Sequence, residues 1–417
     1  MKKYKPIIKQ LEFENLTILY GEPVIYHCNF YNLFLQRTIE DAGEYIDAPK
    51  ILTEGAIFAV YPMLRNLFLK NLSIRDTKER LKVASDIYSH LGFGILPMDD
   101  IVKKNGSIKT KVTHYSISWR LKWNKRDKPV DYFTCGFLSA ALSLAFYKPP
   151  GSFQVTQSRC LSMGDEINEF EFEYRTDFSR FPNSPGVGVT IRDSLGRKPI
   201  PTNINEKEIM QTLKDMPIEG NEEGLIPAFG VILTRHFANY YNYISFETEK
   251  AIFEATKEPS LAIDLFTESG HVCAFNTFGG IMSSEEWYGL IYPQCKNRED
   301  WVSGIVACAN ALGWGFWTVK ELIPYKKLVL RVDGGYESNG YLGFYGKAKS
   351  PKSYLVNGGA AGIMNLLYHG DICKKPVLNE EFYGELFKSD ESFLSNQVKC
   401  RAMGDDWCEF IVEKVTF

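Results

Sequence analysis

Residues 157–172 read QSRCLSMGDEINEFEF, and residues 397–412 read QVKCRAMGDDWCEFIV. Gln, Cys, Met, Gly, Asp, Glu and Phe recur in register between the two stretches, at an offset of 240 residues. In each stretch a Met-Gly-Asp turn separates two segments of β-type sequence, which is typical of a β-hairpin. Two matched hairpins so far apart predict that the chain contains a duplication.

Two shorter matches follow the same order along the chain. Residues 29–32 (NFYN) match 239–242 (NYYN), and residues 91–94 (LGFG) match 312–315 (LGWG). The offset rises along the chain, as it would if the second copy contained longer loops. We therefore expect a first copy over 1–176 and a second copy over 229–417.

The segment between the copies, 177–228, is expected to be a connector. It contains six prolines and several glycines, and proline removes a backbone donor and fixes φ. Within it, Asn205 followed by Glu208 resembles a capping box, which predicts a short helix ending near Leu213.

Each copy is expected to contain the same elements in the same order, on the evidence of apolar spacing. The expected fold class is α/β (α+β), with helices packed on a small antiparallel sheet and the two copies arranged as an intramolecular pseudo-dimer. Small residues over 357–362 (NGGAAG) open the apolar helix of copy 2. They permit close packing, which is the favoured interpretation, or their free N–H groups could bind an anion. The expected helices span about 29–44, 54–91 and 132–147 in copy 1, and about 239–256, 280–311 and 355–369 in copy 2. The expected β-type segments span 109–119 and 152–176, and then 327–332 and 391–415.

The composition of the chain excludes some classes of function. With 48 Lys and Arg against 51 Asp and Glu, the net charge is −3, so a protein devoted to nucleic acid is not expected. No apolar run reaches the roughly 18–20 residues of a membrane span, and the N-terminus lacks a secretory signal. These features predict a cytoplasmic protein. Its nine cysteines are then expected to be free thiols or metal ligands.

Copy 1 carries three reactive side chains that copy 2 lacks. These are His27, Cys28 and His114, and the aligned positions of copy 2 hold no His or Cys. A thiol beside an imidazole is the minimum set for an activated nucleophile, and two His with a Cys could instead bind a soft metal. Local hydrogen bonding and core packing are the other interpretation, since neighbours on a strand face opposite sides.

Tyr31 and Asn32 recur in copy 2 as Tyr241 and Asn242. Both pairs lie near the start of an expected helix. They are candidate ligand-binding groups at the mouth of a cavity, or residues that pack and hydrogen-bond within the fold.

The C-terminal pattern resembles the 4-vinyl reductase-like domain, a family also called predicted hydrocarbon-binding. That family has the fold of the small subunits of the transport protein particle, a vesicle-tethering complex. The resemblance covers about 30–176 and 240–417 and is specific over the last ~20 residues of each copy. The matching residues are Cys400, Gly404, Cys408 and Phe410 in copy 2, and Cys160, Gly164 and Phe170 in copy 1, where Asn168 replaces the second cysteine.

Several properties are implied by this resemblance alone. They include a small hydrophobic or aromatic ligand in an apolar cavity, dimerisation, and a structural zinc ion. The zinc ligands would be Cys373, Cys400 and Cys408, but Gln397 stands at the position of the fourth, acidic ligand. An amide oxygen is not a usual zinc ligand.

Three classes of function remain open at this point. The first is a binding module that senses, carries or sequesters a small hydrophobic or aromatic molecule, alone or with a protein partner. The second is an enzyme of small-molecule or tetrapyrrole-type biosynthesis that uses a His/Cys or metal site in copy 1. The third is a scaffold without a ligand. No P-loop, dinucleotide fingerprint or nucleophile-elbow motif is present in the sequence.

Overall fold

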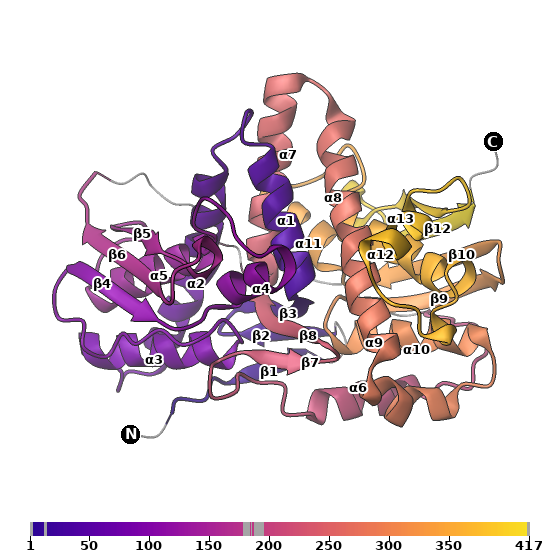
Figure 1. Ribbon diagram of the computed structural model, residues 1–417, viewed down its shortest axis with the longest axis horizontal. Coiled ribbons are helices and arrows are strands. Elements are labelled where there is room, and N and C mark those ends of the chain that lie inside the picture. The colour runs from indigo at the N-terminus through magenta and orange to yellow at the C-terminus, as the bar shows by residue number, and fades with distance from the viewer. Residues whose placement is uncertain (1–2, 12–14, 178–183, 185, 187–195, 415–417) are drawn as a thin grey trace.

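The computed structural model describes residues 3–11, 15–177, 184, 186 and 196–414. These residues form an α+β fold, as expected, and it contains three antiparallel sheets (Figure 1). The strands are β1 Ile8–Leu11, β2 Leu16–Leu19, β3 Glu22–Cys28, β4 Asn105–Thr110, β5 Phe153–Arg159, β6 Asn168–Tyr174, β7 Ile226–Ala228, β8 Val231–Phe237, β9 Phe316–Ile323, β10 Lys327–Asp333, β11 Phe393–Lys399 and β12 Cys408–Lys414.

The helices match most of the expected ranges. Those of the first part are α1 Asn29–Asp41, α2 Ala48–Lys70, α3 Thr77–His90, α4 His114–Trp123, α5 Tyr132–Ala145 and α6 Glu206–Asp215. Those of the second part are α7 Ala238–Thr256, α8 Pro259–Cys273, α9 Gly279–Ser283, α10 Arg298–Ala311, α11 Tyr336–Tyr345, α12 Tyr354–Met364 and α13 Glu380–Phe387. Short helical turns are η1 Leu161–Met163, η2 Ala274–Phe278, η3 Trp287–Ile291, η4 Tyr292–Gln294, η5 Asn365–His369, η6 Ile372–Lys374 and η7 Arg401–Met403.

The two outer sheets contain the hairpins predicted from the Met-Gly-Asp turns. Their strand orders are β4-β6-β5 and β11-β12-β10-β9. Each hairpin turns at a glycine with positive φ, Gly164 at +99° and Gly404 at +107°, a conformation that glycine adopts without steric cost. The register also shifts at the same place in both hairpins, after Gln157 and after Gln397. The two hairpin predictions are confirmed; duplication of the whole chain stays a prediction.

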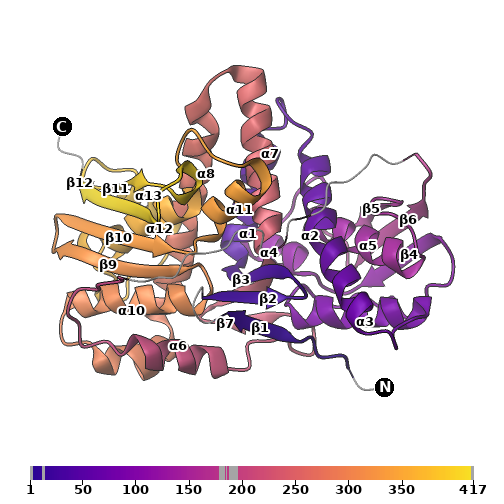
Figure 2. The ribbon, with the colours of Figure 1, turned by 180° about the vertical axis from the view of Figure 1, so that it is seen from behind.

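A central sheet combines strands from the N-terminal segment with two strands from the middle of the sequence, in the order β1-β2-β3-β8-β7. β3 and β8 pair antiparallel, and His27 lies opposite Thr234. This sheet lies between the outer sheets in both views (Figures 1 and 2). Every residue of β3 is buried, so β3 lacks the alternation that marks a half-exposed strand, and the sequence did not reveal it. β7 lies within the segment 177–228 that was expected to be a connector.

The helices pack both within and between the two parts of the chain. α2 packs on α5 and α8 packs on α12, while α1 packs on α8 and α2 packs on α7. A Cβ atom on Gly358 of α12 would lie 2.4 Å from the Thr267 carbonyl oxygen of α8. The close packing predicted for 357–362 is therefore confirmed.

The β-type prediction over 109–119 is wrong beyond Thr110. β4 ends there, and α4 begins at His114. The Thr113 side chain accepts from the Ser116 backbone N–H, and the Ser116 hydroxyl accepts from the Thr113 backbone N–H. This capping box satisfies two donors of the first helical turn. Helix nucleation therefore outweighs the β propensity of the surrounding residues.

The connector contains the short helix that the sequence predicted. Asn205 caps α6, and its side chain accepts from the Glu208 backbone N–H at 3.3 Å. α6 packs on α10. Pro182 and Pro185 of the connector lie outside the described residues.

One continuous apolar core extends through both parts of the described chain. All nine cysteines are free thiols. Among the helices that the structure describes, none has the length and apolar character needed to cross a bilayer.

Candidate functional site

The β3–β8 pair forms the floor of a buried polar site at the centre of the molecule. Residues opposite each other in an antiparallel pair point to the same face. His27 opposite Thr234 and Ile25 opposite His236 therefore place two histidines and a threonine on one face of the sheet. We call the buried group around them the central cluster. It comprises His27, Cys28, Tyr31, Asn32, His114, Thr234, His236, Tyr241, Cys273, Thr277 and Trp314.

Asn32 is the hub of the hydrogen bonds in the central cluster. Its Oδ1 accepts from the Tyr241 hydroxyl at 2.5 Å, and its Nδ2 donates to Thr234 Oγ1 at 3.0 Å. The same Nδ2 lies 2.9 Å from His114 Nε2. His114 Nε2 must accept this hydrogen bond, which places the imidazole proton on Nδ1. That Nδ1 is buried and has no partner among the described residues.

His236 and His27 complete a set of three neutral imidazoles. His236 Nδ1 accepts from the Phe237 backbone N–H at 2.9 Å, so His236 Nε2 carries the proton and donates to the Tyr115 hydroxyl at 3.2 Å. The His27 ring stacks on Trp314 at a centroid distance of 4.8 Å, and its buried Nε2 has no partner in the described part of the chain. Burial lowers the pKa of His114 to about 3 and the pKa values of His27 and His236 well below the usual range.

Cys28 lies at the end of β3 and caps α1. Its Sγ accepts from the Tyr31 backbone N–H at 3.4 Å and from the Thr277 hydroxyl at 2.9 Å. Burial raises the pKa of Cys28, but hydrogen bonds with Cys273 and Thr277 outweigh burial, so the net pKa is lowered. Burial raises the pKa of Cys273 well above its usual range. Cys273 Sγ also lies 3.9 Å from His27 Nδ1.

The structure thus brings together most of the predicted catalytic and ligand-binding residues. His27, Cys28, His114, Tyr31, Asn32 and Tyr241 all belong to the central cluster. Asn242 is buried nearby, where its Nδ2 donates to Asn239 Oδ1 and to the Tyr336 carbonyl. None of these seven residues lines either of the two cavities described below. Their catalytic and binding roles stay predictions.

The predicted zinc ligands do not lie together. Cys400 and Cys408 are buried near η7, and a hydrogen bond with Cys408 lowers the pKa of Cys400 to about 7. Cys373 is half-buried in η6, in the surroundings of Arg298 and Asp371. Across the described ranges, no three or more His, Cys, Asp or Glu side chains are grouped so that they could hold a metal ion. Zinc binding stays a prediction.

Asn168 takes the place of Cys408 in the first outer sheet and makes comparable contacts. Its Oδ1 accepts from the Leu161 backbone N–H at 3.1 Å, as Cys408 Sγ accepts from the Arg401 backbone N–H at 3.4 Å. Asn168 Nδ2 also donates to Ser116 Oγ at 3.1 Å. The Asn168 amide in one hairpin and the Cys408 thiol in the other thus accept hydrogen bonds from equivalent backbone N–H groups.

The opposite face of α1 lines a cavity that the sequence did not reveal. Phe30, Leu33, Phe34 and Arg37 recur at helical spacing, and these side chains turn away from Tyr31 and Asn32. The cavity has a volume of about 320 Å³, and we call it the α1 cavity. Its walls come from α1, α4, α8 with η2, and the start of α13, and the lining residues beyond α1 are Lys122, Trp123, Val272, Phe275, Asn276, Leu378, Asn379, Glu380 and Tyr383.

A π-helical turn shapes the wall formed by α8 and η2. η2 continues α8 over Ala274–Phe278, and such turns occur frequently at functional sites. Here Phe275 and Asn276 line the α1 cavity, while Thr277 holds Cys28 in the central cluster. The two sites are therefore separated by α1 and by this one turn.

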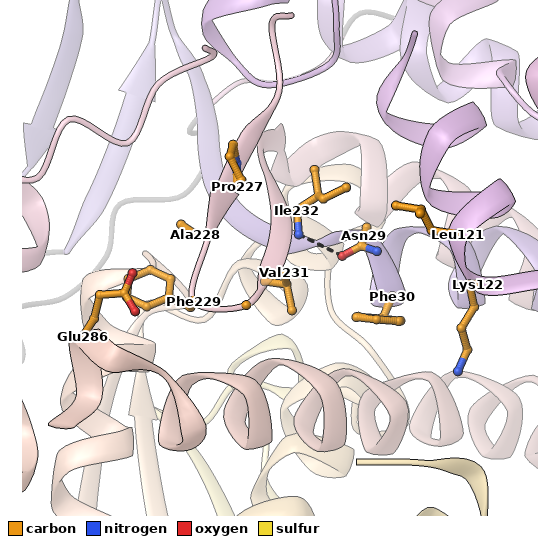
Figure 3. A pocket seen from close by; sticks show the side chains of 11 residues that line it. Asn29, Phe30, Leu121, Lys122, Pro227, Ala228, Phe229, Val231, Ile232 and Glu286 are labelled. Atoms are coloured by element: carbon orange, nitrogen blue, oxygen red, sulfur yellow. Dashed lines mark hydrogen bonds between the residues drawn. The ribbon is translucent and has the colours of Figure 1, made fainter. Parts of the chain in front are cut away.

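A second cavity, of about 550 Å³, opens beside the β7–β8 hairpin (Figure 3). We call it the hairpin cavity. Asn29 Oδ1 accepts from the Ile232 backbone N–H at 3.1 Å and fixes the hairpin against α1. Phe30 and Lys122 line both cavities. The two cavities therefore meet at this pair of side chains.

No protein-family model and no curated protein match the sequence, so the resemblance to 4-vinyl reductase-like domains stays a prediction. Among solved structures, the chain is similar to the phenol-responsive sensory domain of the transcription activator PoxR, determined with phenol. The TM-score is 0.34 and the identity is 14%, over 50% of this chain and 90% of that chain.

Proposed function

We propose that the chain binds a small, largely apolar molecule with an aromatic ring in the α1 cavity. The observation that carries the proposal is the lining of this cavity. Aromatic side chains from distant parts of the sequence converge on it, among them Phe34, Trp123, Phe275 and Tyr383. Ligand pockets in proteins are mostly apolar and have volumes of about 300–1,000 Å³, and the α1 cavity, at about 320 Å³, lies at the small end of this range.

The aromatic walls suit a planar ligand in particular. Aromatic rings attract one another in offset or edge-to-face geometry at centroid distances of about 4.5–7 Å. Phe275 and Tyr383 already meet edge to face at 5.3 Å, and Trp123 packs against Trp119 at 4.6 Å behind the wall. A ring entering the cavity would extend these contacts, and the few polar groups on the wall would orient it.

A pair of matched variants tests this proposal with 2-naphthol, a neutral fluorescent probe. Val272 of α8 lines the α1 cavity, and Ile263 of the same helix is half-buried but does not. We expect Val272→Phe to fill the cavity and weaken binding at least about tenfold, the size of effect of one lost hydrophobic contact group. Ile263→Phe is expected to bind like the unmodified protein.

Isothermal titration calorimetry gives the affinities, and far-UV circular dichroism checks that both variants fold. Absence of binding to the unmodified chain by both 2-naphthol and its anionic analogue 2-naphthoate would contradict the proposal. Equal weakening by both variants would place the probe elsewhere.

A further inference from the structure

Two cations on the wall of the α1 cavity define the kind of aromatic ligand that it suits. Arg37 comes from α1 and Lys122 from α4, and Glu380 is the one acidic side chain among the described residues of the lining. The lining therefore carries a net charge of +1. Resting on the proposed function, we infer that the ligand is a small aromatic carboxylate rather than a neutral hydrocarbon or phenol.

Both cations lie over rings that line the same cavity. The Arg37 guanidinium carbon is 5.0 Å from the centroid of the Trp123 ring, and Lys122 Nζ is 5.6 Å from that of Phe30. Both distances are within the range of cation–π attraction. The rings thus hold the cations at the cavity wall, where an anionic group on an aromatic ligand meets positive charge beside an apolar surface.

Within the described residues, neither cation forms a close ion pair with a carboxylate. Arg37 Nε lies 3.6 Å from Asp41 Oδ2, and Lys122 Nζ lies 3.9 Å from Glu380 Oε1. Both separations exceed the length of a hydrogen bond. The carboxylate side chains are 70% and 87% exposed, and such exposed pairs contribute little to stability.

Arg126, by contrast, forms a close and buried ion pair. One of its terminal nitrogens donates to both Glu40 oxygens at 3.0 Å, and both side chains are only 5% exposed. Arg37 lacks such a partner and keeps its planar fork of N–H donors. That fork matches a carboxylate in geometry as well as charge.

Lys122 also places positive charge where the α1 cavity and the hairpin cavity meet. It borders both the α1 cavity and the hairpin cavity, as does Phe30. Figure 3 shows both side chains at the hairpin cavity. An anionic ligand arriving through the hairpin cavity would therefore meet Lys122 before its ring reaches the aromatic wall.

The test compares 2-naphthoate with 2-naphthol, which share one ring system and differ in charge at pH 7. Calorimetric titrations use the full chain and the variants Arg37→Gln, Lys122→Gln and the double variant. Arg65→Gln is the matched control, because Arg65 is an exposed arginine of α2 that lines neither cavity. We expect the unmodified chain to prefer 2-naphthoate by about tenfold or more, the scale of a charge-assisted hydrogen bond.

The ratio of the two affinities is the decisive readout. We expect it to fall to near one in the double variant, to stay unchanged in Arg65→Gln, and to fall in the unmodified chain when salt is added. A preference for 2-naphthol, or a preference for 2-naphthoate that survives the double substitution, would overturn the inference alone. Absence of binding by either probe would overturn both the inference and the proposed function.

Discussion

At the scale of single residues, three buried histidines stay neutral and add no charge to the interior of the molecule. Hydrogen bonds assign the protons of His114 and His236, and burial keeps both rings and that of His27 neutral. When the pKa of a histidine is lower in the folded state than in the unfolded state, acidification protonates the unfolded state at a higher pH than the folded state. The contribution of such a histidine to stability is therefore fully present above about pH 6.5 and is lost as the pH falls towards the folded-state pKa.

His114→Gln is expected to weaken the acid sensitivity of the protein. The pKa of His114 is lowered to about 3, so this residue alone contributes a slope of about 1.4 kcal/mol per pH unit between roughly pH 6 and pH 4. The glutamine oxygen can replace His114 Nε2 as acceptor of the Asn32 amide. Urea unfolding at several pH values measures the slope for both proteins. Parallel curves would contradict the assignment of a neutral, buried His114.

At the scale of elements, close contacts between helices depend on small residues at particular positions. α12 approaches α8 so closely that a Cβ on Gly358 would lie 2.4 Å from the Thr267 carbonyl oxygen and 2.6 Å from the His271 backbone nitrogen. Backbone atoms cannot move aside as a flexible side chain can. The helix pair therefore requires glycine at position 358 for reasons of space, not of φ.

Gly358→Ala is expected to lower the free energy of unfolding by about 1–3 kcal/mol, the usual cost of overpacking. Gly384 of α13 is the matched control, because a Cβ there meets no atom within 4 Å. Gly384→Ala should be neutral or stabilise by about 0.4–1 kcal/mol, since alanine reduces the entropy of the unfolded chain. Urea denaturation measures both changes. Equal effects of the two substitutions would show that α8 and α12 can separate freely.

The whole molecule is held together by contacts between residues about 200 positions apart. β3 pairs with β8, α1 packs on α8, and α2 packs on α7. The Tyr241 hydroxyl donates to Asn32 across this junction. The two parts of the described chain share one apolar core, so neither completes its core alone.

We therefore expect unfolding in one cooperative transition, with Tyr241→Phe lowering stability by about 1–3 kcal/mol. The substitution leaves the buried Asn32 Oδ1 without its donor, and an unsatisfied buried acceptor costs this much. Far-UV circular dichroism and tryptophan fluorescence should give coincident transitions for both proteins. Two separated transitions would show that the copies fold independently.

The sequence alone determined the features that depend on neighbouring residues. The hairpins at Gly164 and Gly404, the apolar helices, the cap of α6 at Asn205 and the small residues of α12 were all predicted, because turn chemistry and apolar spacing act over a few residues. The start of α4 was missed although it also depends on a local signal. The capping box of Thr113 and Ser116 is there in the sequence, but β-branched neighbours obscured it.

Only the tertiary structure shows where the candidate reactive residues lie relative to the cavities. The sequence singled out His27, Cys28 and His114 as reactive, and only folding shows that they are buried beside Asn32 and away from both cavities. The α1 cavity arises from α1, α4, α8 and α13, which no short-range pattern relates. Contacts between residues so far apart have no local signature, so pairing of β3 with β8 and the charge of the cavity wall follow from the packed chain as a whole.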